Sequence, residues 1–366
     1  MTLAHDPVLG RMTRHESFQD LGVSTYQRVR AAILGGHHGL ARDYIEYFHD
    51  EALVCRRLYD QWLVDAHKYL LHKGVAERTV DAAYQRILRV IAPAGQPEWD
   101  RVAGWQRYLD LKAGLQAGLN DSGAAAASLL DALGTMKEAW RLVHDLDVDA
   151  LLGLFDTVID ELGEAAIGEM WEQYLVRDWF DKRYARFDVS RADWKESFRL
   201  LVFLSFEAMH GHLCGPQREG DVEYREFDDR VELEFDPCGS GGRAYRGEPL
   251  DGTGSRMLAP YGFKPVQGAY DFTWNKPGIC TYCAHCCVLT ELMPARSFGY
   301  PVRVIDPPSY PHAANAKCRY TIYKDPRAIP EHVYRRIGMT KPSSDQPLGS
   351  AHGPFDAGRT VSGDTK

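Results

Sequence analysis

The chain has 366 residues, of which 45% are hydrophobic and 26% are charged, and its formal net charge at pH 7 is −8. This length exceeds one ordinary domain, so we expect two domains with enough apolar material for a substantial core. The negative charge argues against a nucleic-acid partner, because proteins that bind nucleic acids usually present a basic face.

The sequence also argues against a membrane partner. Residues 1–17 are polar and lack the apolar centre of a signal peptide. The most apolar stretches, residues 123–133 and 200–206, are shorter than a helix that spans a bilayer. We therefore expect a cytoplasmic protein whose eight cysteines are free thiols or metal ligands, because disulfides are rare in that reducing compartment.

The first part of the chain has helical periodicity. Residues 1–24 are expected to form a flexible arm, since chain termini often fray. Residues 25–215 repeat apolar side chains at steps of three and four, as in the segments 41–48, 55–64 and 150–159. This pattern predicts an α-helical bundle over residues 25–215.

The pattern changes after Gly215, where strands and turns replace helices. Residues 222–227 and 231–235 alternate apolar and polar side chains around a polar turn, which indicates a β-hairpin. Further on, we expect a short helix ended by Pro294, two strands and a last helix, over residues 284–293, 302–305, 320–323 and 330–337.

Together these elements predict an α+β fold in two parts. The helical bundle is followed by a smaller Cys-rich α+β domain, residues 216–340, which contains the hairpin and a small sheet. Residues 341–366 are rich in Ser, Gly, Asp and Pro, which favours a disordered tail.

The distribution of cysteines predicts a metal site. Four lie within the eight residues 280–287, and two more, Cys238 and Cys318, stand at the ends of predicted strands. Thiolates at Cys-x-x-Cys spacing point toward one ion, and a structural zinc ion takes four such ligands in a tetrahedron. We favour Cys283 and Cys286 as one pair, because Cys286 begins a helix whose dipole stabilises a thiolate. The predicted zinc ligands are Cys238, Cys283, Cys286 and Cys318.

An iron–sulfur cluster is the alternative occupant of these thiols. Cys280, Cys283 and Cys286 match the first three ligands of a bacterial ferredoxin run. The fourth step of that run is missing, because Cys287 is adjacent to Cys286 and Val288 follows. Both occupants stay open at the level of the sequence.

The segment Asp236-Pro-Cys-Gly-Ser-Gly-Gly-Arg243 allows a second role for Cys238. Its glycines free the backbone to form a nest of N–H groups that could hold an anion or an oxyanion. Cys238 would then be a nucleophile, and Arg243 would lower the pKa of its thiol or bind a carboxylate.

Histidines at the end of the helical part supply further candidates. Glu207 and His210 are three residues apart, and Glu46 and His49 repeat that spacing. Two Glu-x-x-His pairs in a bundle are part of a di-iron carboxylate site, so di-iron is another alternative cofactor. His210 and His212 also stand at the expected domain junction, where ligand pockets often form.

No nucleotide-binding, serine-hydrolase or zincin motif is present in the sequence. We therefore expect a zinc-binding cytoplasmic enzyme that acts on a small anionic molecule between the two domains, by hydrolase- or lyase-like chemistry. The alternatives are a non-enzymatic ligand sensor or adaptor with a structural zinc ion, and a di-iron or iron–sulfur oxidoreductase. The candidate catalytic residues are Cys238, Arg243, His210 and His212.

Overall fold

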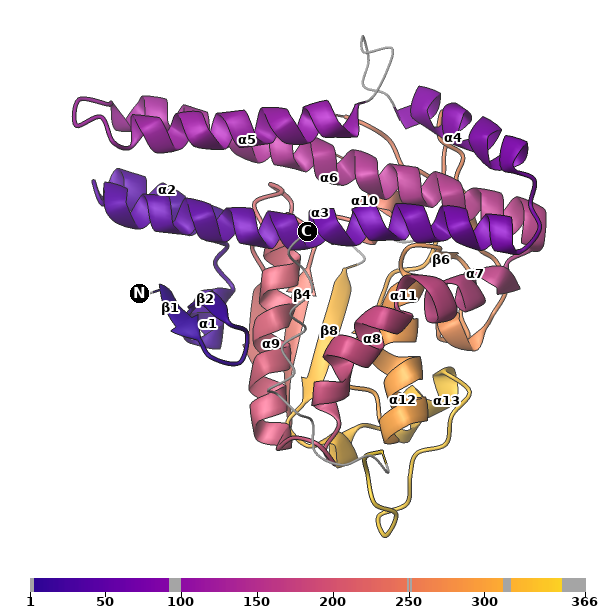
Figure 1. Cartoon of the computed structure of the whole chain (residues 1–366). Helices are drawn as coiled ribbons and strands as arrows, with labels where there is room; N and C mark the ends of the chain where they lie inside the picture. Colours follow the sequence, from indigo (N-terminus) through magenta and orange to yellow (C-terminus); the bar gives the residue numbers. More distant parts are fainter. Residues whose placement is uncertain (1–2, 92–99, 249, 251, 312–316, 351–366) are drawn as a thin grey trace.

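A computed structural model describes residues 3–91, 100–248, 250, 252–311 and 317–350. Long helices lie side by side in it (Figure 1): α3 (His38–His72), α5 (Arg101–Gly118) and α6 (Ala126–Leu162). The 37-residue α6 is buried through its middle, because α2 (Thr25–Leu34), α4 (Glu77–Ile91) and α7 (Ala165–Met170) also pack on it. The predicted helical bundle is therefore confirmed.

Helix α9 (Trp194–Gly211) lies crosswise to the long helices and connects the bundle to the rest of the chain (Figure 1). The chain reaches it through η1 (Trp171–Leu175), α8 (Arg177–Arg183) and η2 (Tyr184–Phe187). Asp193 begins α9 by accepting a hydrogen bond from the amide of Lys195. The helix packs on α3 and on a strand of the sheet, so its last turn delivers His212 to the boundary between them.

The sheet has four antiparallel strands in the order β3 (Glu223–Glu226), β4 (Arg230–Phe235), β8 (Cys318–Tyr323) and β7 (Val304–Asp306). The first two strands confirm the predicted hairpin, and the other two confirm the strands expected near residues 302 and 320. Phe235 pairs with Cys318, and Cys238 follows Phe235 by three residues. This register brings the ends that carry Cys238 and Cys318 to one edge.

Short elements complete the second part of the chain. They are α10 (Gly241–Arg246), β5 (Pro265–Val266), η3 (Asp271–Thr273), β6 (Ile279–Cys280), α11 (Ala284–Cys287), η4 (Val288–Leu292), α12 (Met293–Phe298), η5 (Pro326–Ala328) and α13 (Glu331–Arg336). Helix α13 confirms the helix expected at residues 330–337. The fold is a mixed α+β arrangement with a large helical part.

The helix predicted to end at Pro294 continues instead to Phe298. Proline has no amide N–H and so leaves a carbonyl of the preceding turn without its helical partner. Here η4 is a π-helical turn, and the carbonyl of Thr290 accepts hydrogen bonds from the amides of Val302 and Arg303. Because that carbonyl has other partners, the chain passes Pro294 without breaking the helix.

The predicted flexible arm is also corrected by the structure. Residues 3–21 form the hairpin β1 (Leu3–Asp6) and β2 (Arg11–Arg14) and the short helix α1 (Phe18–Leu21). Arg11 in β2 forms an ion pair with Glu207 of α9, which fixes this segment on the bundle. At the other end, residues 341–350 contain no helix or strand, and residues 351–366 of the predicted tail lie outside the described residues.

One apolar core extends through both parts of the chain, from Leu21 to Ile337. Within the described residues, no helix has both the length and the apolar character required to span a membrane.

Candidate functional site

Three polar side chains converge on the ring of His212, just past the end of α9. Its Nδ1 lies 2.9 Å from the hydroxyl oxygen of Tyr59, 3.0 Å from Nε2 of His144 and 3.1 Å from the hydroxyl oxygen of Ser240. The hydroxyl of Tyr282 contacts that of Tyr59 at 3.2 Å. Tyr59, His144, Ser240 and Tyr282 are buried, whereas His212 keeps some accessible surface.

The hydrogen-bond pattern fixes the protons of the two histidines. Burial would raise the pKa of Asp145, but Arg218 and Arg243 hold it well below its usual range. The carboxylate therefore accepts a hydrogen bond from Nδ1 of His144, at 2.9 Å. Burial lowers the pKa of His144, so its ring is neutral near pH 7 and its Nε2 carries the lone pair.

It follows that Nδ1 of His212 donates the hydrogen bond to His144. Burial lowers the pKa of His212 well below its usual range, and neighbouring His144, His285 and Arg218 add to the shift. A neutral imidazole with a proton on Nδ1 has its lone pair on Nε2. Among the described residues, that Nε2 has no hydrogen-bond partner, so it is a proton acceptor within a partly accessible ring.

An ion-pair network lies behind this centre and holds it in place. Arg218 binds Asp145 through two hydrogen bonds of 2.7 and 3.1 Å and also pairs with Glu248. Arg243 pairs with Asp149, which in turn pairs with Arg256 at 3.0 Å. Because every charge in this interior network has an opposite partner, the cost of removing it from water is offset.

Two glycines allow the loop of Ser240 to approach the centre closely. A Cβ atom at Gly239 would lie 1.7 Å from the carbonyl oxygen of His212, and one at Gly241 would lie 2.2 Å from the Sγ atom of Cys283. Neither position can hold a larger residue without a shift of the backbone or of the thiol. The Gly-rich run therefore positions Ser240 beside His212 and Cys238 beside the thiols.

Cys238 sits where backbone amides surround its sulfur. Burial raises the pKa of its thiol, but hydrogen bonds from the amides of Gly242, Ser240 and Gly241 act in the opposite direction. Such donors stabilise a thiolate that binds a metal or attacks an electrophile. The amides of the Gly-rich loop therefore point at the sulfur of Cys238.

The structure brings five thiols into one group, which we call the thiol cluster. Burial raises the pKa of the Cys318 thiol, and nearby Cys238 and Cys286 add to the shift. A hydrogen bond with Cys280 and burial raise the pKa of Cys283, and Cys286 and Cys238 add to that shift. Burial opposes ionisation of Cys280, yet hydrogen bonds from the thiol and amide of Cys283 and from the amide of Tyr282 lower its pKa. In the part of the chain that the structure describes, no three His, Cys, Asp or Glu side chains stand in metal-binding geometry.

His285 joins the thiol cluster to the His212 centre. Its Nδ1 lies 2.6 Å from the carbonyl oxygen of Tyr282, and its Nε2 lies 3.5 Å from the Sγ atom of Cys286. The rings of Trp62 and Trp171 pack against it at centroid distances of 5.4 and 5.2 Å. The two sets of polar groups therefore form one site with an aromatic wall, and we call it the histidine–thiol centre.

Two of the predicted catalytic residues have partners that hold them elsewhere. His210 is buried, with Nδ1 3.0 Å from Glu51 and Nε2 2.9 Å from the carbonyl oxygen of Leu21. Arg243 is buried among carboxylates, so its charge is already balanced. Cys238 and His212, by contrast, both lie in the histidine–thiol centre.

The side chains considered for a di-iron site have other partners. Glu46 is bound to Lys112 and Gln116 near the surface, and His49 stacks on Trp105. Glu207 pairs with Arg11 and Tyr47.

The sequence reading missed six residues of this region: Tyr59, His144, Asp145, Ser240, Tyr282 and Arg303. A signal for two of them is visible in hindsight. The run His144-Asp-Leu-Asp-Val-Asp149 places four polar residues in the buried middle of α6, which continues through them. Buried polar groups require partners, so such a run marks a network.

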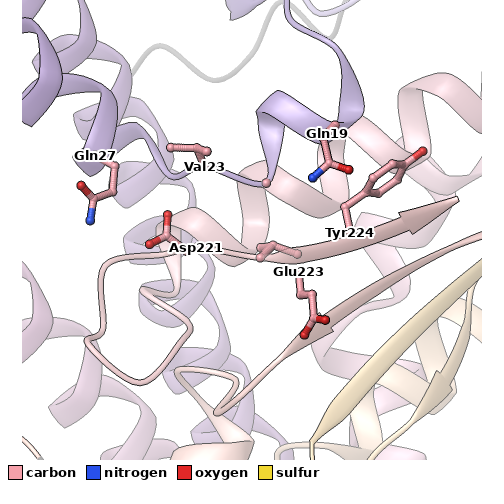
Figure 2. A pocket seen from close by; sticks show the side chains of 8 residues that line it. Gln19, Val23, Gln27, Asp221, Glu223 and Tyr224 are labelled. Carbon is pink, nitrogen blue, oxygen red and sulfur yellow. The ribbon is translucent and has the colours of Figure 1, made fainter.

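A separate groove of about 400 Å³ lies on the surface between the α1–α2 connection and β3 (Figure 2). Gln19, Gln27, Asp221 and Tyr224 are among its lining residues, and none of the histidine–thiol centre lines it. Comparisons of this chain with protein-family models, curated proteins and solved structures find no match.

Proposed function

We propose that the chain is an enzyme that uses the histidine–thiol centre for proton transfer on a small anionic molecule, in a hydrolytic or lyase-type reaction. The observation that carries the proposal is the neutral His212 ring, fixed through Nδ1 and free at Nε2. A partly accessible histidine whose tautomer is set by a second histidine and a carboxylate has the features of a positioned general base.

Each neighbouring side chain has a part in this proposal. Nε2 of His212 accepts a proton from the substrate or from a water molecule. His212 and His144 hydrogen-bond to each other, which leaves the hydroxyl groups of Tyr59 and Ser240 as donors. In this proposal the two hydroxyl groups donate hydrogen bonds to an oxygen atom of the substrate. Asp145 acts through His144 and is a positioning residue.

The proposed zinc ion would be held by Cys238, Cys283, Cys286 and Cys318. The backbone amides around the sulfur of Cys238 fit a thiolate ligand, which supports this set. Four thiolates close the coordination sphere of zinc, so the ion would stabilise the segment around α10 and α11 rather than activate water.

An iron–sulfur cluster is a second candidate occupant, favoured by the hydrogen bonds at Cys280. The amides of Cys283 and Tyr282 point at its sulfur, as backbone amides do around cluster ligands. This would add Cys280 to the ligands and assign the protein an oxidoreductase role. Iron and acid-labile sulfide in the purified protein would support it.

A conversion screen tests the enzymatic proposal. The full chain is incubated with a complex metabolite mixture, and its components are followed by mass spectrometry beside an equal amount of His212→Gln. We expect at least one small anion to be consumed by the wild-type protein and to persist with the variant. If both proteins leave every metabolite unchanged, the sensor or adaptor alternative replaces the enzyme.

A further inference from the structure

Arg303 differs from Arg218 and Arg243 in its charge balance. It lies directly before β7 and is densely surrounded by protein, yet it keeps some accessible surface. Among the described residues, no carboxylate forms an ion pair with it, and its Nε lacks a hydrogen-bond partner. Arg218 and Arg243, in contrast, each bind two carboxylates.

Neutral groups hold the guanidinium of Arg303 in a fixed position. Its Nη1 donates to the hydroxyl oxygen of Ser205 at 2.8 Å, and its Nη2 lies 3.5 Å from that of Tyr184. The plane lies over the ring of Tyr320, 4.4 Å from the centroid. Hydroxyls and an aromatic face orient a cation without cancelling its charge.

Arg303 borders the same site as the proposed base. The ring of Tyr320, over which Arg303 lies, carries a hydroxyl oxygen 3.8 Å from the Sγ atom of Cys286. That Sγ atom lies 3.5 Å from Nε2 of His285, so a chain of contacts leads from Arg303 into the centre. Cys286 and Cys318 of the thiol cluster are also close to Arg303. A guanidinium that is largely enclosed and has no carboxylate partner loses hydration without compensation, so this arrangement favours an anion beside it.

We infer that Arg303 binds the carboxylate group of the substrate and is the anion-binding residue of the histidine–thiol centre. The guanidinium fork matches a carboxylate in shape and charge, which a single ammonium group does not. The inference rests on the proposed function, because it names the anionic group of that substrate and the residue that receives it. It also transfers to Arg303 the role that the sequence suggested for Arg243.

The alternative is that Arg303 balances the negative charge of metal-bound thiolates. The two roles differ in what is lost when the guanidinium is removed. A substrate-binding arginine can be changed while the metal stays, whereas a counter-charge to the thiolates affects retention of the metal.

Acetate and its neutral analogue acetamide are suitable probes for the full, metal-loaded chain. Thermal unfolding is followed at equal ionic strength in each compound. We expect acetate, and not acetamide, to raise the midpoint of the wild-type protein by about 2–4 °C when its concentration is well above the dissociation constant. Arg303→Gln should lose this shift, and Arg303→Lys should bind acetate about tenfold more weakly.

Arg296→Gln is the matched control, because Arg296 is exposed on α12 and pairs with Glu172 and Asp271. It should keep the full acetate shift. The metal content of each variant is measured in parallel. If Arg303→Gln does not fold, Arg303→Lys decides the question.

Two results would overturn the inference. One is equal behaviour of acetate and acetamide on the metal-loaded wild-type chain. The other is loss of metal from Arg303→Lys together with the acetate shift, which would assign Arg303 to the thiolates. Neither result removes the proposed function, since conversion of a metabolite by the wild-type protein and not by His212→Gln is measured independently.

Discussion

His144 and His212 meet through their ring nitrogens, with 3.0 Å between Nε2 of the first and Nδ1 of the second. The first ring comes from the middle of α6, and the second comes from the turn that follows α9. Because Nδ1 of His144 donates its proton in a hydrogen bond to the Asp145 carboxylate, Nε2 of His144 is an acceptor and the shared proton belongs to His212. One contact between two distant segments therefore determines which nitrogen of His212 is available for chemistry.

Two histidines only two positions apart should respond in opposite ways to the same substitution. His212→Gln should lower turnover of the metabolite found in the conversion screen by about 10²–10⁴-fold, since it removes the general base. His210→Gln should leave turnover near the wild-type value and lower the midpoint of thermal unfolding, because His210 links Glu51 to the carbonyl of Leu21. A turnover loss that is larger for His210→Gln than for His212→Gln would contradict these roles.

The stability of the protein should fall steeply below pH 6.5. Burial lowers the pKa of five histidines, to about 4 for His285 and about 3 for His210. These rings are neutral when folded and take up protons when the chain unfolds, so their stabilising effect is complete above pH 6.5 and is lost as pH falls toward the folded pKa values. Each contributes a slope of up to about 1.4 kcal/mol per pH unit.

Urea unfolding between pH 5 and 7.5 measures this slope. His210→Gln should reduce the proton uptake on unfolding by about one proton in the lower half of that range. A free energy of unfolding that stays constant from pH 7 to 5 would show that the histidines are not held neutral.

The interior ion-pair network should be sensitive to loss of one carboxylate. Asp145→Asn removes the negative charge that accepts two hydrogen bonds from Arg218. The substitution should lower the free energy of unfolding by about 3–5 kcal/mol. Glu138→Gln on the same helix is the control, because 44% of the Glu138 side chain is exposed and its pair with Arg141 should contribute about 0–1 kcal/mol. Equal effects of the two substitutions in urea unfolding would be inconsistent with a buried network.

Periodicity was sufficient to predict the helical bundle, the hairpin around residue 228 and the short strands near 304 and 320. These elements follow from local alternation of apolar residues, and a single sequence carries that information directly. The path past Pro294 could not be predicted, because the carbonyl of Thr290 is satisfied by residues 302 and 303, which lie beyond the local window. The ordered N-terminal hairpin depends in the same way on the distant Glu207.

The site was predictable only in part for a related reason. Cys-x-x-Cys spacing indicated Cys283 and Cys286 from sequence, and the ends of predicted strands indicated Cys238 and Cys318. Tyr59, His144 and Ser240 come from three separate segments and have no common motif. The different roles of Arg243 and Arg303 likewise depend on the fold, which places two carboxylates beside Arg243 and, among the described residues, forms no ion pair with Arg303.

Native mass spectrometry of the full chain, purified without chelators, tests most directly whether the thiol cluster holds the proposed metal. We predict one zinc ion per chain, retained in Cys287→Ser and lost from Cys286→Ser. The thiol of Cys287 donates to the carbonyl oxygen of Asp271 instead, so these adjacent residues form a matched pair. A metal-free wild-type chain, or equal metal content in the two variants, would contradict the histidine–thiol centre as a metal-containing site.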